Sequence, residues 1–340
     1  MWFAVPGDLE LPTGGYEYAR RVLEGVPGLR HLQLPGGFPV PGDAELRETA
    51  GLLAGIPADD VVLFDGLALG AMPGWCLDAL RARLVALVHH PLCLETVVAA
   101  AAQAALRRSE TLALARAAHV ITTSRSTADL LVRDFGVTAE RLSVAEPGTA
   151  PALRAARVGS PQHLLSAGAV TPRKGYDVLV EALAGLGDLD WRLTIAGDLT
   201  RNPACAALLA EAVAVHGLGG RVTLTGTISD TAMAELYAGA DVFVSSAHHE
   251  GYGMAAADAL AYGLPLVVTR AGALSDTIPA DAAVVCAPGD VDGLRRALAL
   301  MLTDAVTRER CAEASWQAGQ RLPRWADTAR IIAGVLGRAG

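Results

Sequence analysis

Short apolar runs alternate with longer segments of helical periodicity along most of the chain. This alternation is typical of βαβ units, in which helices cover both faces of a parallel sheet. The strands predicted in the first half are Trp2–Val5, Val61–Phe64, Leu84–Val88, His119–Thr122 and Leu142–Val144. Those predicted in the second half are His163–Ala167, Arg192–Ala196, Val222–Thr225, Val242–Ser245, Leu266–Thr269 and Ala283–Cys286.

Helices are expected between the strands of the second half and after the last of them. The predicted helices are Tyr176–Gly185, Pro203–His216, Asp230–Ala238, Gly253–Tyr262, Val291–Leu302, Arg308–Gly319 and Trp325–Leu336. A segment rich in Pro, Gly and Ala, Glu146–Gln162, separates the two runs and predicts a linker. We therefore predict an α/β fold of two tandem, Rossmann-like, doubly wound domains, 1–155 and 156–323. Ligands of such sheets bind outside the carboxyl ends of the strands, so the loops after strands are the places to search.

Composition narrows the class of protein. At 340 residues the chain exceeds what one hydrophobic core normally serves, which agrees with two domains. Apolar residues make up 52% and charged residues 19%, which excludes a disordered chain. A net charge of −8 argues against a protein that binds nucleic-acid phosphates. The five cysteines are scattered without zinc-site spacing, so we expect a reducing compartment and no structural metal.

The chain carries no membrane or export signal that we recognise. Its first residues lack a basic region followed by an apolar run, so no secretory signal is expected. No apolar stretch approaches the roughly 18–20 residues that span a bilayer. We therefore expect a cytoplasmic protein with at most weak peripheral membrane contact.

The segment Asp241–Val268 combines a strand, a glycine turn and a helix. Glu250 precedes the turn Gly251–Gly253, and Asp258 follows eight residues after Glu250 on the predicted helix. A helix N-terminus favours anions, and carboxylates accept hydrogen bonds from sugar hydroxyls. The alternative is that Glu250 is an ordinary loop residue and Asp258 an ordinary charge on the helix surface.

Three further loops follow predicted strands. Arg173 and Lys174 precede a helix and suit a diphosphate, although basic pairs are common in loops. Gly14 and Gly15 lead into a helix and can approach a phosphate, although a plain strand–helix turn explains them too. Of the histidines that end the strand Leu84–Val88, one can bind a substrate hydroxyl or a leaving phosphate. The other histidine of this pair, His89 or His90, is then a packing residue; the pair His248 and His249 is a rival that we interpret as positioning residues beside Glu250.

Taken in this order, the Gly-Gly loop, the strand-end histidine, the TPRKG loop and the EGYG turn with its following helix resemble the retaining family 4 glycosyltransferases of the GT-B fold. The resemblance covers nearly the whole chain and is most specific over Leu164–Pro288. It implies that Glu250 contacts the donor sugar, that Asp258 contacts the ribose and that Lys174 binds the diphosphate. It also implies that His89, rather than His90, is the functional histidine at the end of its strand. It also implies that the last helix, about 324–340, packs back onto the first domain and that the ligand cleft lies between the domains.

The remaining donor contacts implied by the resemblance are mostly backbone groups. They would come from the glycine loop of the first domain, the turn after the first strand of the second domain, the loop around the base and the turn before the helix: Gly14, Gly15, Gly168, Gly226, Ile228, Gly251, Tyr252, Gly253 and Met254. The chain departs from the pattern twice. Ala169 stands where the family often has an arginine, which Arg173 would replace, and Asp258 stands where the second glutamate is usual.

The resemblance implies an enzyme that transfers a hexose-type sugar from a nucleotide diphosphate sugar to an acceptor hydroxyl with retention. UDP is the favoured donor nucleotide and GDP a possible one. Front-face attack without metal or other cofactor is expected, and Asp188–Asp190 and Asp290–Asp292 are interpreted as structural. A nucleotide-sugar epimerase of the same architecture and a non-catalytic nucleotide-sugar binder are the alternatives. The acceptor is not indicated.

Overall fold

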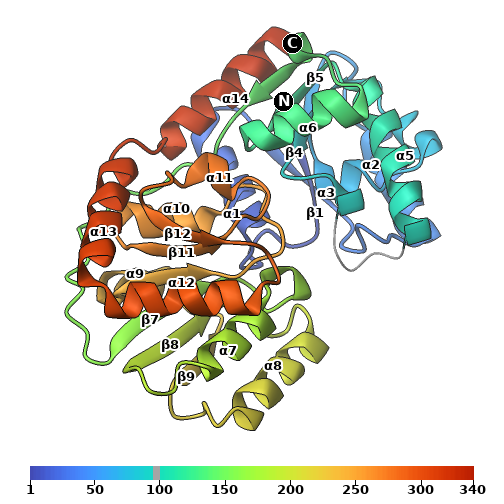
Figure 1. Cartoon of the computed structure of the whole chain (residues 1–340). Helices are drawn as coiled ribbons and strands as arrows, with labels where there is room; N and C mark the ends of the chain where they lie inside the picture. The colour runs from blue at the N-terminus through green and yellow to red at the C-terminus, as the bar shows by residue number, and fades with distance from the viewer. Residues whose placement is uncertain (95–99) are drawn as a thin grey trace. The chain divides into compact units, whose positions relative to one another are not determined.

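The chain folds into two compact units, each built around one parallel sheet (Figure 1). The computed structural model describes residues 1–94 and 100–340. The first unit comprises Met1–Gly148 with Pro323–Gly340, and the second comprises Thr149–Leu322. The predicted fold class, two tandem doubly wound α/β domains, is confirmed.

The sheet of the first unit has the strand order β2-β1-β3-β4-β5-β6, and all its pairs are parallel. Its strands are β1 (Trp2–Pro6), β2 (Arg30–Leu34), β3 (Val61–Asp65), β4 (Arg83–Val88), β5 (His119–Thr122) and β6 (Leu142–Val144). The pattern did not predict β2. This edge strand buries only Leu34, so it lacks the apolar run that marks the inner strands.

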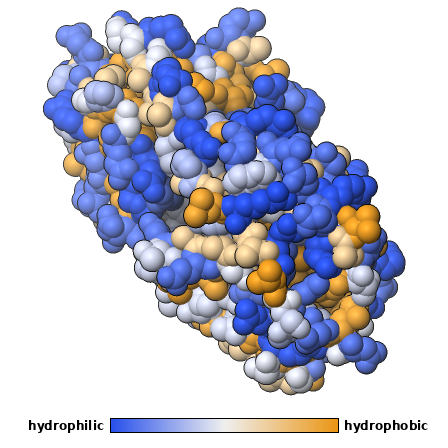
Figure 2. Space-filling model, turned by 90° about the vertical axis from the view of Figure 1, so that its left-hand side faces the viewer, coloured by the Kyte–Doolittle hydropathy of each residue, from blue (hydrophilic) through white to orange (hydrophobic). Residues whose placement is uncertain are grey.

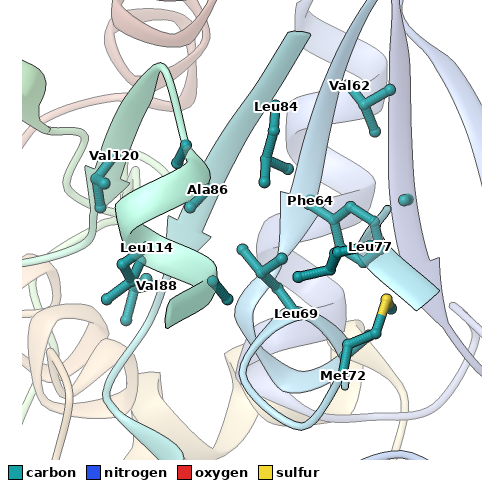
Figure 3. Close-up of a cluster of buried hydrophobic side chains, with 14 of the residues drawn as sticks. Val62, Phe64, Leu69, Met72, Leu77, Leu84, Ala86, Val88, Leu114 and Val120 are labelled. Atoms are coloured by element: carbon teal, nitrogen blue, oxygen red, sulfur yellow. The ribbon is translucent and has the colours of Figure 1, made fainter. Parts of the chain in front are cut away.

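The helices of the first unit divide between the two faces of its sheet. They are α1 (Gly14–Gly25), α2 (Asp43–Ala54), α3 (Gly66–Leu69), α4 (Gly74–Leu77), α5 (Ala100–Arg116), α6 (Arg125–Phe135) and α14 (Trp325–Ala339), with short 3₁₀ turns η1 (Leu92–Leu94) and η2 (Ala139–Arg141). Side chains alternate along each strand between two apolar cores. Val62 and Phe64 of β3 point into one core with Leu84 and Ala86 of β4 (Figure 3), while Leu63 belongs to the other.

The last helix, α14, belongs to the first unit although it ends the chain. Its buried face shares a core with Val22 of α1. Gly25 admits the close approach of α14, because a Cβ at that position would lie 2.7 Å from the Cβ of Ala329. The Thr328 hydroxyl donates to the Glu146 carbonyl oxygen at 2.7 Å. Apolar packing and this hydrogen bond therefore hold the C-terminal segment in place.

The sheet of the second unit has the order β12-β11-β10-β7-β8-β9 and is also parallel. Its strands are β7 (Gln162–Ala167), β8 (Trp191–Ala196), β9 (Val222–Gly226), β10 (Val242–Ser245), β11 (Leu266–Thr269) and β12 (Ala283–Cys286). Its helices are η3 (Pro172–Lys174), α7 (Tyr176–Ala184), α8 (Pro203–Val215), α9 (Asp230–Gly239), α10 (Met254–Ala261), α11 (Leu274–Thr277), α12 (Val291–Thr303) and α13 (Ala305–Gly319). One apolar core contains residues of α7, α8 and α12, and a second contains residues of α9, α10, α11 and α13.

The face of the molecule drawn in Figure 2 is mostly polar. On the face drawn in Figure 2, hydrophobic residues are scattered among hydrophilic ones. Of the helices in residues 1–94 and 100–340, none combines the length and the apolar character needed to cross a membrane.

Candidate functional site

Each sheet has one point at which its strand order reverses. In the second unit the chain starts at β7, adds β8 and β9 on one side, and then crosses to β10 on the other side of β7. In the first unit the corresponding neighbours are β1 and β3. Ligands of open α/β sheets bind at the carboxyl ends of such strands, because the loops there diverge and leave a crevice. The loops after β7 and β10, and those after β1 and β3, are therefore the places to examine.

The loops after β7 and β10 meet in a cluster of three charged side chains. Lys174 Nζ donates to Glu250 Oε1 at 2.6 Å, and an Arg173 guanidinium nitrogen donates to Glu250 Oε2 at 3.1 Å. Glu250 is 8% exposed. Burial by itself raises the pKa of Glu250, but the charges of Lys174 and Arg173 and their hydrogen bonds outweigh it and lower the pKa to about 2. The carboxylate is therefore ionised at neutral pH, and both predicted cations accompany it.

Backbone hydrogen bonds fix these two loops against one another. The Arg173 guanidinium also donates to the His249 carbonyl oxygen at 2.6 Å, and the His248 N–H donates to the Arg173 carbonyl oxygen at 2.8 Å. The Ser246 hydroxyl donates to the Lys174 carbonyl oxygen at 3.0 Å. Arg173 thus binds the loop that carries Glu250 as well as its carboxylate. The sequence indicated a pair of cations here but not this bracing role.

Gly175 ends the basic turn in a conformation that only glycine adopts easily. Its φ of 60° lies in the left-handed region, and a Cβ there would lie 2.4 Å from the Ser246 carbonyl oxygen. Any side chain at this position would push the loop after β7 away from the loop after β10. The glycine of the TPRKG motif therefore serves the close contact between Lys174 and Glu250.

Lys174 is the only lysine in the chain; the other residues counted with it as Lys or Arg are all arginines. Its side chain lies against Gly168, where a Cβ would be 2.7 Å from Nζ. The Tyr176 hydroxyl donates to the Gly168 carbonyl oxygen at 3.0 Å and holds this turn. The absence of a side chain at Gly168 therefore leaves the space that the end of the Lys174 side chain occupies. Ala169, next to Gly168, contributes no charge.

The glycine turn after Glu250 leads directly into α10. Gly253 caps the helix with a φ of 92°, and a Cβ there would lie 2.3 Å from Leu274 Cδ2. The Ala273 N–H donates to the Glu250 carbonyl oxygen at 2.9 Å. Tyr252 is buried, and its carbonyl oxygen accepts from the Thr277 hydroxyl at 2.7 Å. Gly251, Tyr252 and Gly253 therefore form a rigid turn at the positive end of the helix that Met254 begins.

Asp258, the second carboxylate of this motif, comes after Glu250 and belongs to α10. It lies in the second turn of α10, partly buried, beside the stacked rings of Tyr237 and Tyr262, whose centroids are 5.3 Å apart. Burial raises the pKa of both tyrosines, and the Asp258 charge raises it further. Glu250 and Asp258 thus occupy different surroundings although they share one motif.

The loop predicted to contact the base begins at the end of β9. Gly226 has a φ of 68°, and its carbonyl oxygen accepts from the Gly197 N–H at 3.1 Å. Ile228 lines a groove of about 470 Å³ together with residues of β8, β9 and α9. That groove runs from Thr225 to His163 and does not include the charged cluster.

The first unit brings two other predicted residues together. Gly14 and Gly15 are the first residues of α1, whose N-cap Thr13 accepts from the Tyr16 N–H. A Cβ at Gly15 would lie 3.9 Å from His89 Nε2, so the start of α1 is next to the histidine that follows β4.

Two buried carboxylates of the first unit were not predicted. Asp65 ends β3 and lies 3.5 Å from His89 Nε2. Glu110 of α5 accepts from the Leu92 and Cys93 N–H groups at 2.6 and 3.1 Å and so anchors the loop after His89; burial raises its pKa. The position of Asp65 directly after an apolar strand could have indicated it, since strand ends were the places to search. Nothing in the local sequence indicates Glu110.

Within the described ranges there is no group of three or more His, Cys, Asp or Glu side chains arranged to hold a metal ion. Asp290, one of the residues interpreted as structural, caps α12 by accepting from the Gly293 N–H at 2.8 Å.

Comparison with known families gives two matches that together span most of the chain. Residues 155–317 match the family model described as glycosyl transferases group 1. Residues 8–148 match the model described as glycosyl transferase 4-like domain.

Several characterised proteins are similar in sequence. MMP alpha-(1->4)-mannosyltransferase of Mycolicibacterium hassiacum is 31% identical over 283 residues, which cover 78% of this chain and 67% of that protein. D-inositol 3-phosphate glycosyltransferase of Xylanimonas cellulosilytica is 29% identical over 238 residues, which cover 65% of this chain and 57% of that protein. A GDP-mannose-dependent alpha-(1-6)-phosphatidylinositol dimannoside mannosyltransferase of Mycobacterium tuberculosis is 36% identical over 153 residues, 44% of this chain and 38% of that protein. The chain thus matches under two thirds of the length of some of these relatives.

Solved structures agree on the architecture. Sucrose-phosphate synthase from Thermosynechococcus elongatus has a TM-score of 0.80 at 19% identity and is covered over 98% of its length by 99% of this chain. HepE from Anabaena, solved in complex with UDP-glucose, has a TM-score of 0.78 at 18% identity. The match covers 99% of this chain and 100% of that protein. At these identities the likeness establishes the fold.

Proposed function

Since the chain belongs to the glycosyl transferases group 1 family and has the GT-B fold, we propose that it is a retaining transferase that moves a hexose-type sugar from a nucleotide diphosphate sugar to an acceptor hydroxyl. The observation that carries the proposal is the contact of Lys174 and Arg173 with Glu250 where the sheet order reverses. This place therefore combines a compact cation, a buried carboxylate and the N-terminus of a helix. Together these groups suit a ligand that carries both phosphate and hydroxyl groups.

The chemistry of these groups fits the two halves of such a donor. Lys174 and the start of α10 attract the diphosphate, the first by its charge and the second through the helix dipole. Glu250 stays ionised and accepts hydrogen bonds from sugar hydroxyls. In the free protein Lys174 and Glu250 neutralise one another at 2.6 Å, so donor binding exchanges this contact for one between Lys174 and phosphate and one between Glu250 and the sugar.

The cations also serve the chemical step. When the glycosidic bond breaks, negative charge develops on the departing diphosphate and positive charge on the anomeric carbon. A preorganised cation binds the diphosphate more tightly in the transition state, where its negative charge is larger, than in the ground state. Such a cation therefore raises kcat. We propose that Lys174 acts in this way, and that Arg173 contributes by fixing Glu250 and its loop.

Retention, metal independence and the front-face route belong to the same proposal and follow the family resemblance. In the front-face route a phosphate oxygen of the donor takes the acceptor proton on the side from which the diphosphate leaves. The positive charge that a metal would bring to the diphosphate is supplied in this proposal by Lys174 and by the start of α10. UDP is the favoured nucleotide, and the name of the M. tuberculosis relative makes GDP the competing one.

The first test measures donor binding, because the identity of the acceptor is not indicated and a binding assay does not need it. Lys174 carries the only ε-amine of the chain. Acetylation with a limiting amount of an amine-reactive reagent, followed by peptide mass spectrometry, therefore reports on this one side chain. UDP or GDP, and the corresponding UDP-glucose or GDP-mannose, should slow acetylation of Lys174 but not of the N-terminal amine. A Lys174 acetylation rate that no nucleotide or nucleotide sugar lowers would contradict the diphosphate site.

Donor turnover separates the proposed enzyme from the alternatives. Without an acceptor, a transferase slowly transfers the sugar to water and releases nucleoside diphosphate. NMR of the first free sugar formed then reports whether the anomeric configuration is retained. An epimerase would convert the donor without releasing nucleoside diphosphate, and a binder would do neither.

A further inference from the structure

His89 and Asp65 face one another at the carboxyl ends of two adjacent strands, β4 and β3, of the first unit. His89 Nε2 is buried and, among residues 1–94 and 100–340, has no hydrogen-bond partner. The nearest charged atom is Asp65 Oδ2 at 3.5 Å, within ion-pair range and just beyond an ordinary hydrogen bond. The His89 side chain is 24% exposed, and that exposure excludes Nε2.

Asp65 is held in place by its own backbone surroundings. It is 5% exposed, and Oδ1 accepts from the Leu67 N–H at 2.8 Å, which caps α3. Gly66 lets this turn approach the next strand, because a Cβ there would lie 2.8 Å from the Leu87 carbonyl oxygen. One carboxylate oxygen is thus occupied by the backbone, and the other, Oδ2, is directed at His89.

The imidazole ring is held from its other sides as well. The edge of Tyr18 packs against it with centroids 5.1 Å apart, and the Tyr18 hydroxyl donates to the Ala145 carbonyl oxygen. The Thr123 hydroxyl donates to the His89 carbonyl oxygen at 3.2 Å. On the same loop Glu110 binds the backbone after His90. Asp65 is therefore the charged group nearest to Nε2, while Tyr18 packs against the ring and Thr123 and Glu110 fix the backbone on either side.

We propose that Asp65 is a positioning residue whose carboxylate keeps the proton of neutral His89 on Nε2, so that Nδ1 accepts a hydrogen bond from a substrate hydroxyl. The partner of one imidazole nitrogen decides the protonation of the other. The contact with a substrate rests on the proposed function, whereas the tautomer is a property of the free protein. The competing explanation is that Asp65 only caps α3.

Asp65→Asn separates the two roles. Leu67 N–H still needs an acceptor, so it keeps the amide oxygen, and the amide nitrogen then faces His89 Nε2 as a donor. A residue that only caps α3 would tolerate this change. If Asp65 sets the tautomer of His89, the substitution should reverse that tautomer and move the proton to Nδ1.

The full-length protein, labelled with ¹⁵N-histidine, is examined by two-bond ¹H–¹⁵N NMR at a pH at which His89 is neutral, and the His89 signals are assigned with His89→Gln. The wild type should show a protonated Nε2 and a bare Nδ1, and Asp65→Asn the opposite. Asp304→Asn changes another capping aspartate, which accepts from the Val306 and Thr307 N–H groups, and should leave His89 unchanged. If Asp65→Asn fails to fold, Asp65→Ser keeps an acceptor for Leu67 and removes the carboxylate.

Kinetics add a second readout. The kcat/KM of donor hydrolysis should fall about 10–100-fold in Asp65→Asn, the range typical when a functional histidine loses its carboxylate partner, with an unchanged thermal midpoint. A protonated Nδ1 in the wild type, or an unchanged tautomer in the variant, overturns the proposal. If the protein hydrolyses no nucleotide sugar, the proposed function fails, and the tautomer still decides the role of Asp65.

Discussion

Lys174 Nζ and Glu250 Oε1 are 2.6 Å apart although 76 residues separate them in the chain. Lys174 follows β7 and Glu250 follows β10, two strands that pair in parallel at the point where the sheet order reverses. The contact depends on two glycines, because a Cβ at Gly168 would meet the lysine side chain and one at Gly175 would meet the loop after β10. Topology and glycine placement together put a cation beside a carboxylate at the expected ligand site.

Removing the lysine should abolish most of the activity. Lys174→Ala should lower kcat for donor hydrolysis by about 10²–10³, the usual effect of removing one preorganised group that stabilises transition-state charge. Lys174→Arg should recover only part, because a planar guanidinium does not place its charge as a compact ammonium does. Steady-state kinetics on both variants make the check, and wild-type kcat in Lys174→Ala would refute the diphosphate site.

Arg173 should matter through Glu250. Its guanidinium contacts both the Glu250 carboxylate and the His249 carbonyl oxygen, so Arg173→Ala should loosen the loop and lower kcat, though less than Lys174→Ala does. Arg173→Lys should restore a part, since one ammonium lacks the fork of donors. Arg330→Ala, which removes an arginine of α14 whose side chain is 73% exposed, is the control. A silent Arg173→Ala variant would mean that the bracing contacts are dispensable.

The Glu250 cluster should give the protein a distinct acid response. The folded pKa of Glu250 is about 2, below the value of about 4.3 for an unfolded glutamate. Its contribution to the free energy of unfolding, on the order of 3 kcal/mol, is thus complete above about pH 4.5 and declines as the pH falls toward 2. Urea unfolding of the wild type and Glu250→Gln should show a stability gap that is constant from pH 8 to 5 and narrows below.

A control glutamate sharpens this measurement. Glu309 pairs with Arg157 on the surface, and its side chain is 64% exposed, so Glu309→Gln should change stability by less than about 1 kcal/mol at any pH. Glu250→Gln should also lose most turnover at pH 7. A stability gap that stays constant below pH 4 would show that Glu250 is not held ionised by its two cations.

Asp258 should act on nucleotide affinity more than on turnover. If it binds the ribose, Asp258→Ala should weaken binding of free UDP or GDP about 10–100-fold, the value of a hydrogen bond to a charged group. Asp258→Glu should retain binding, because it supplies the longer carboxylate that the family usually has. Calorimetric titration of both variants makes the comparison. Unchanged affinity in Asp258→Ala would leave this residue with a role only in packing beside Tyr237 and Tyr262.

Activity should not require a divalent metal. In the proposed mechanism Lys174 and the start of α10 balance the charge of the diphosphate, so donor hydrolysis should persist after dialysis against EDTA. Loss of activity that Mg²⁺ or Mn²⁺ restores would contradict the metal-independent part of the proposal.

The sequence alone determined the architecture, because the spacing of apolar residues and the length of apolar runs depend directly on which positions are buried. Buried parallel strands such as β10 and β11 are continuous apolar runs, and their predicted bounds match the structure. The edge strand β2 was not predicted, because a strand with one neighbour and an exposed face has no continuous apolar run. The loops after strands could likewise be singled out, because their glycines and charges interrupt the apolar pattern.

Only the tertiary structure decided which side chains act together. No local pattern shows that Arg173 braces the Glu250 loop, that Lys174 lies against Gly168, or that Asp258 acts on the buried Tyr237. Asp65 and His89 lie on neighbouring strands, and their contact depends on how β3 and β4 pair. Strand order and register are set by packing over the whole sheet, so contacts between distant loops follow from the fold and cannot be read from the residues around each one.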